Sequence, residues 1–139
     1  MYNGVMEKTI LKYALMSLSC AFFLFSAATV SIGAERITAE ELKAMLDSKE
    51  KVVLIDVRTP QEHYEAHIPG SILMPLDTLK GVDKLPTGAK HIIYCRSGKR
   101  SLTAIDILSA KGFKNLVDLK GGINAWTAIG GPVVSGTSR

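Results

Sequence analysis

Two short apolar runs, each followed by a signal for a helix, indicate the fold class of this chain. Residues 51–57 and 91–94 are rich in β-branched side chains, which is typical of strands buried on both faces. Pro60 can begin a short helix after the first run. After the second run, apolar residues recur at helical spacing between positions 102 and 108. This alternation predicts an α/β domain with a mainly parallel β-sheet flanked by α-helices.

Weaker signals predict the other elements. Thr38 and Glu41 have the spacing of a capping box, so we expect a helix over residues 38–48. A turn at 67–71 leads into a brief strand at 72–74. The remaining elements, in chain order, are a weak helix and loop over 76–89, a helix cap at Gly112, a strand at 116–119, a turn at Gly121-Gly122 and a short helix over 123–128 with Trp126 in the core.

The N-terminal segment has the pattern of an export signal. Residues 13–32 carry no charge, Lys8 and Lys12 precede them, and small residues follow. We therefore predict a signal peptide over residues 1–34 and a periplasmic location. The run is also long enough to span a bilayer, so an uncleaved membrane anchor formed by residues 13–32 is the alternative.

The remaining chain predicts one domain over residues 35–132, followed by a flexible tail at 133–139. This part carries fifteen basic and twelve acidic side chains, a balance that argues against a nucleic-acid partner. If the leader is removed, Cys95 is the only cysteine, so an internal disulfide is excluded. A lone thiol in an oxidising compartment points to a chemical role.

The segment after the second strand has the features of a reactive thiolate site. Cys95 lies where a strand ends and a helix begins, and the amides and dipole at such a point favour an anion. Arg96, Lys99 and Arg100 favour the thiolate further, and Gly98 permits a tight loop. The alternative is a buried structural cysteine beside surface cations.

The loop length distinguishes two chemistries. Cysteine phosphatases place five residues between the nucleophile and the arginine that binds phosphate. Here only four residues separate Cys95 from Arg100. The smaller ring suits a sulfur atom better than a tetrahedral phosphate, so the spacing favours sulfur transfer.

Several blocks of the chain resemble signatures of the rhodanese family. They are residues 56–60 with Glu62, residues 67–71, the six-residue loop 95–100, and Gly121-Gly122 followed by Trp126. The resemblance implies a rhodanese-like fold and a double displacement, in which Cys95 takes sulfur from a donor such as thiosulfate and passes it to cyanide or a thiol. The loop residues expected to bind the donor are Arg96, Ser97, Gly98, Lys99, Arg100 and Ser101.

The resemblance also implies structural support for the loop. Arg58 and Glu62 are expected to pair near the active site, Asp56 to bond loop backbone, and His67 to act as a scaffold residue rather than a general base. The three histidines lack the spacing of a metal site, so neither a metal nor another cofactor is expected.

Two other functions stay open at this level. One is a phosphatase or arsenate reductase on the same fold. The other is a non-catalytic module that relays sulfur to a partner at the membrane. Otherwise the expected partners are a small anionic sulfur donor and a thiophilic acceptor.

Overall fold

The computed structural model describes residues 33–88 and 90–137. The predicted signal peptide or anchor therefore lies almost entirely outside the described residues. Within the described part of the chain, no helix is both long and apolar enough to cross a membrane.

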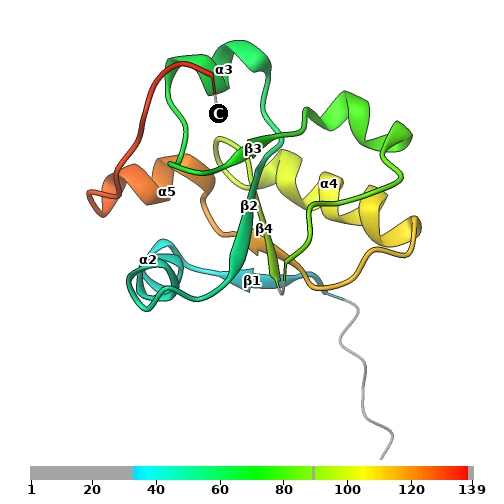
Figure 1. Ribbon diagram of the computed structural model, residues 1–139, viewed down its shortest axis with the longest axis horizontal. Helices are drawn as coiled ribbons and strands as arrows, with labels where there is room; N and C mark the ends of the chain where they lie inside the picture. Colours follow the sequence, from blue (N-terminus) through cyan, green and yellow to red (C-terminus); the bar gives the residue numbers. More distant parts are fainter. Residues whose placement is uncertain (1–32, 89, 138–139) are drawn as a thin grey trace, which may run out of the picture. The chain divides into compact units, whose positions relative to one another are not determined.

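A five-stranded, fully parallel sheet forms the centre of the domain, with the strand order β1-β5-β4-β2-β3 (Figure 1). The predicted α/β class and parallel sheet are confirmed. The strands are β1 (Glu35–Ile37), β2 (Val52–Asp56), β3 (Ile72–Leu73), β4 (Lys90–Tyr94) and β5 (Leu116–Leu119).

Strand β1 was not predicted. It is three residues long and begins with the charged pair Glu35-Arg36, so no apolar run marks it. It forms by pairing with β5, which lies far along the sequence, and it becomes the edge strand of the sheet. Such long-range pairing leaves no periodicity for a local reading to detect.

The predicted helices form close to their expected positions. Thr38 and Thr59 each begin a helix with a complete capping box, which satisfies backbone donors at the helix start. Leu102 is only partly buried, because Ser101 and Ala104 occupy the face of its helix that meets the sheet. The helices are α2 (Ala39–Asp47), α3 (Pro60–Glu65), the 3₁₀ helix η1 (Leu76–Gly81), α4 (Lys99–Ala110) and α5 (Gly122–Ala128).

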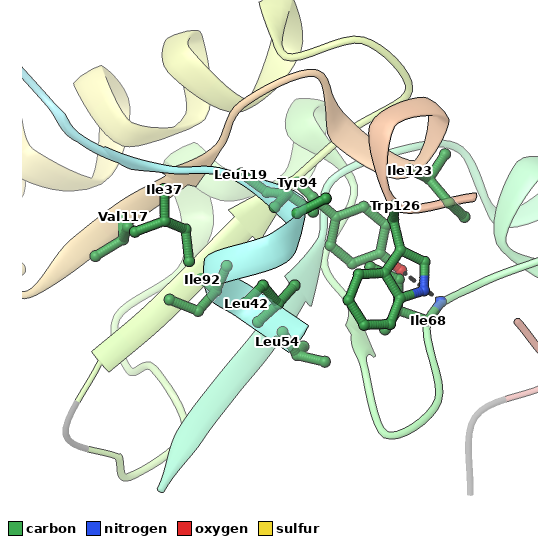
Figure 2. Close-up of a cluster of buried hydrophobic side chains, with 11 residues drawn as sticks. Ile37, Leu42, Leu54, Ile68, Ile92, Tyr94, Val117, Leu119, Ile123 and Trp126 are labelled. Atoms are coloured by element: carbon green, nitrogen blue, oxygen red, sulfur yellow. Dashed lines mark hydrogen bonds between the residues drawn. The ribbon is translucent and has the colours of Figure 1, made fainter. Parts of the chain in front are cut away.

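Apolar side chains cover both faces of the sheet. Helices α2 and α5 cover one face, and α4 with η1 covers the other (Figure 1). Trp126 is buried in the α2–α5 layer, as predicted, and Figure 2 shows it beside Tyr94. The opposite layer contains Cys95, packed with Val57 and Ala104.

The segment predicted as a flexible tail makes backbone hydrogen bonds. His67 and Val134 exchange two of them, each 2.9 Å long, and the Gly136 amide donates to the Tyr64 carbonyl at 2.8 Å. Residues 133–137 therefore lie along α3 and the turn that follows it.

The strand order places the loop after β4 at a favourable position for a site. From β2 the chain continues to β3 at one edge of the sheet, whereas from β4 it continues to β5 toward the other edge. The connections after β2 and β4 thus diverge at the carboxyl ends of adjacent strands, the point where open α/β sheets bind ligands.

Candidate active site

Cys95 directly follows the central strand β4 and is 1% exposed. Its Sγ accepts a hydrogen bond from the Gly98 amide at 3.1 Å and lies 3.6 Å from the Ser101 hydroxyl. Burial by itself would raise the pKa of the Cys95 thiol, but hydrogen bonds from Ser101 and from the Gly98 and Ser97 amides outweigh it. The pKa of Cys95 is therefore lowered, as a nucleophilic thiol requires.

Gly98 allows the loop to close around the sulfur. Its φ of 98° lies in the left-handed region, and it caps the N-terminus of α4. A side chain there would be strained, so the tight approach of its amide to Cys95 depends on glycine.

Backbone amides at the start of helix α5 bind the carbonyl groups of the Cys95 loop. The Ile123 amide donates to the Cys95 carbonyl at 2.9 Å, and the Asn124 amide donates to the Arg96 carbonyl at 3.1 Å. Gly122, with a φ of 60°, packs so closely that a Cβ would collide with the Cys95 carbonyl oxygen. Because these carbonyls bond to α5, the loop amides are left to face the sulfur.

The three cations of the loop have different surroundings. Arg96 and Lys99 are exposed. Arg100 instead forms a two-point ion pair with Glu62, at 2.8 Å for each contact. This pairing, helped by the Thr59 amide, lowers the pKa of Glu62 to about 2.

The expected Arg58–Glu62 pair is wrong. Arg58 binds the Asp56 carboxylate through its amide, Nε and Nη2, the last at 2.7 Å. Glu62 is held at the start of α3 by its capping box with Thr59, where it faces Arg100. The bond from the Arg58 amide does match the expectation that Asp56 binds loop backbone.

Asp56 is the centre of a buried polar network. Besides Arg58, it is bonded to His63 Nδ1 at 2.9 Å and to the Tyr94 hydroxyl at 3.1 Å. Burial opposes ionisation of Asp56, but the hydrogen bonds from Arg58 and His63 outweigh it and lower its pKa. Sequence reasoning missed His63, because a lone histidine on a short helix gives no sign of its partner.

Tyr94, which precedes Cys95, ties this network to the turn after α3. Its hydroxyl accepts from the Ile68 amide at 3.2 Å, the dashed contact in Figure 2, and lies 2.9 Å from the Ser71 hydroxyl. Burial, together with the charge of Asp56, raises the pKa of Tyr94. His67 is buried in the same region, with its Nδ1 2.8 Å from the His63 carbonyl oxygen.

A second buried network lies under the loop. The Ser101 hydroxyl donates to Asp118 at 2.5 Å, and Asp118 accepts from Arg36 Nε at 2.9 Å. Ser101 was predicted as a binding residue, but Asp118 and Arg36 were not identified. Asp118 lies within an otherwise apolar strand, and a buried charge at such a place is the one signal that sequence could have offered.

Two hollows flank the loop. One of about 310 Å³ is lined by Arg100 together with apolar residues such as Val57 and Leu76. The other, of about 210 Å³, has both polar and apolar walls and is lined by Arg96, Glu62 and residues of α5. Among the described residues, no group of three or more histidine, cysteine or acidic side chains could hold a metal ion.

Comparison with known proteins gives a consistent result. A family model described as "Rhodanese-like domain" matches residues 38–129. A protein named "Sulfurtransferase" from Allochromatium vinosum is 36% identical over 71% of this chain and 94% of its own length. The "Thiosulfate:glutathione sulfurtransferase" of Saccharomyces cerevisiae is 35% identical over 66% of this chain and 77% of its own.

Other relatives are longer than this chain. The "Probable adenylyltransferase/sulfurtransferase MoeZ" of Mycobacterium tuberculosis is 42% identical over 65% of this chain, but this covers only 24% of its length. Among solved structures, a rhodanese-related protein from Thermoplasma volcanium is similar with a TM-score of 0.62 and 34% identity, covering 72% of this chain and 97% of that one.

Proposed function

This chain belongs to the rhodanese-like domain family, and we propose that it is a sulfurtransferase in which Cys95 carries the sulfur as a persulfide. The observation that carries the proposal is the position of the Cys95 sulfur, which is buried at the end of the central strand and bonded by the Gly98 amide. Such a setting stabilises an anionic sulfur.

The reaction follows as two displacements. The Cys95 thiolate attacks the outer sulfur of thiosulfate, so a new S–S bond forms while the donor's S–S bond breaks and sulfite leaves with the electron pair. Cyanide or a thiolate acceptor then attacks the outer sulfur, and the Cys95 thiolate leaves. Each half needs a good sulfur nucleophile and a stable sulfur anion as leaving group. The loop amides serve both needs.

A small anionic donor fits this site best. Because only 1% of Cys95 is exposed, a donor must present its transferable sulfur at a narrow tip, as thiosulfate does. Arg96 and Lys99 are exposed beside the loop and supply positive charge along the approach. The name of the yeast relative, which pairs thiosulfate with glutathione, supports a thiol as acceptor.

Intact-mass measurement after thiosulfate treatment tests the proposal. We expect a gain of one sulfur atom that disappears on adding cyanide and does not form in Cys95→Ser, because serine cannot form a persulfide. Cys20→Ser is the matched control, since it removes the other cysteine and should gain sulfur normally.

Two results would contradict the proposal. Turnover of a small aryl phosphate with no sulfur gain would favour a phosphatase. Sulfur uptake that no small acceptor can discharge would favour a relay module that needs a protein partner.

We also propose that the domain acts after export, as the N-terminal sequence predicts. N-terminal sequencing of the protein from a periplasmic fraction tests this. A free N-terminus near residue 34 supports export with cleavage, whereas an intact Met1 in the membrane fraction supports the anchor.

A further inference from the structure

A row of contacts connects the Cys95 sulfur to the surface through the buried interior. Sγ lies 3.6 Å from the Ser101 hydroxyl, which donates to Asp118 Oδ1 at 2.5 Å. The other carboxylate oxygen of Asp118 accepts from Arg36 Nε at 2.9 Å. Ser101 and Asp118 are fully buried, whereas the Arg36 side chain is 42% exposed.

The Ser101 hydroxyl has one hydrogen but two possible acceptors, Asp118 Oδ1 and the Cys95 sulfur. An ionised carboxylate only accepts hydrogen bonds, and Asp118 accepts one from Ser101 and one from Arg36. The hydrogen of Ser101 is therefore directed at Asp118. In this state its oxygen can accept the Cys95 thiol hydrogen. It can donate to the thiolate, and so lower the pKa of Cys95 as described above, once its own hydrogen has moved to Asp118.

We propose that Asp118 is a positioning residue that takes up, through Ser101, the proton released when the Cys95 thiolate forms. The S–H bond of Cys95 breaks and leaves its electron pair on sulfur, while that proton forms an O–H bond on Ser101. The original Ser101 proton moves to Asp118 Oδ1. Nothing is oxidised or reduced, and one negative charge moves from Asp118 to the sulfur.

Two physical arguments support this shift. First, the number of buried negative charges stays constant, so the cost of desolvating a second anion is avoided. Second, after the shift Ser101 donates to the thiolate, which joins it to the loop amides that stabilise the sulfur anion. Arg36 tolerates a neutral Asp118 because it is partly in water. Among the described residues, the charged and polar groups bonded to Asp118 are Arg36 from β1 and Ser101 from α4, with Cys95, which follows β4, beyond Ser101.

The pH dependence of Cys95 alkylation by iodoacetamide tests the proposal without requiring sulfur transfer. When two groups share one proton, the fraction with the proton on the partner does not depend on pH until the pair as a whole titrates. We expect the wild-type rate to stay nearly constant between about pH 5 and about pH 7. The rate is followed on the Cys95 peptide by mass spectrometry, so that Cys20 does not contribute.

Three variants complete the experiment. Ser101→Ala removes the connecting hydroxyl but keeps the Asp118–Arg36 pair. The alkylation rate of this variant should show no plateau and should fall about tenfold for each unit by which the pH is lowered. Asp118→Asn should give the same slope, and Ser101→Thr should restore the plateau. The proposal would be overturned if the wild-type rate fell about tenfold for each unit by which the pH is lowered across the interval. A plateau that persists in Ser101→Ala would also overturn it. Failure of the persulfide test would leave this result unaffected.

Discussion

Arg100 and Glu62 lie 38 positions apart in sequence and form a two-point ion pair at the edge of the Cys95 loop. Each nitrogen of the guanidinium end contacts a different carboxylate oxygen at 2.8 Å. The pair fixes the start of α4 against the start of α3. It also means that the charge of Arg100, a residue predicted to bind the donor, is already neutralised by a protein carboxylate.

Replacing Glu62 should therefore strengthen donor binding. In Glu62→Gln the Arg100 charge is released, and we expect the KM for thiosulfate to fall about threefold, equivalent to less than about 1 kcal/mol, with a smaller change in kcat. Glu65→Gln is the matched control, because Glu65 lies on the same helix and bonds Gln61 instead. An equal fall in both variants would show only a change in net charge.

The Glu62–Arg100 pair should make the free energy of unfolding depend on pH in the acid range. The pKa of Glu62 is lowered to about 2 in the folded chain, so its contribution is fully present above the unfolded pKa and is lost as pH falls toward 2. Because both side chains are partly exposed, the loss should be about 1 kcal/mol. Urea unfolding at pH 6 and pH 3 measures it. Glu62→Gln should lose less stability than wild type over this interval, and an equal loss would contradict the assignment.

Gly122→Ala should disable the loop as well as weaken the fold. Its positive φ costs about 1 kcal/mol for an alanine, and the added methyl collides with the Cys95 carbonyl. Gly112→Ala has a similarly positive φ but no neighbour within 4 Å, so it isolates the backbone cost. We expect a loss of about 1 kcal/mol for Gly112→Ala with normal Cys95 alkylation. Gly122→Ala should lose more unfolding free energy and should show slower alkylation of Cys95. Equal losses and equal alkylation rates in the two variants would rule out the steric role of Gly122.

Asp56→Asn should be strongly destabilising. It leaves the buried Arg58 guanidinium without its carboxylate, and breaking a buried pair costs about 3 to 5 kcal/mol. Asp106→Asn, on the exposed face of α4, is the control and should change the free energy of unfolding by no more than about 0.5 kcal/mol. Urea denaturation compares the two, and a small effect at Asp56 would mean that Arg58 finds another partner.

The sequence predicts the local part of this structure well. The runs at 51–57 and 91–94 and both capping boxes are local patterns, and each forms the expected element. The position of Cys95 between a strand and a helix is likewise local, and so is the need for Gly98.

What the sequence does not predict is pairing across the fold. Glu62 bonds Arg100 rather than Arg58, and Asp118 bonds Ser101, because these partners meet only once the sheet places their elements together. The order of the strands determines these contacts, and local periodicity carries no information on it. For the same reason the role of α5 in holding the loop was not anticipated.

The contacts from α5 bear on how this loop could be moved into another protein. The Cys95 and Arg96 carbonyls are bonded by amides nearly thirty residues further along the chain. A graft of the six loop residues alone would leave those carbonyls free to rotate and the sulfur without its ring of donors. A transplant that works must bring the double glycine and the first turn of the last helix with it, so the reactive unit is two distant segments rather than one.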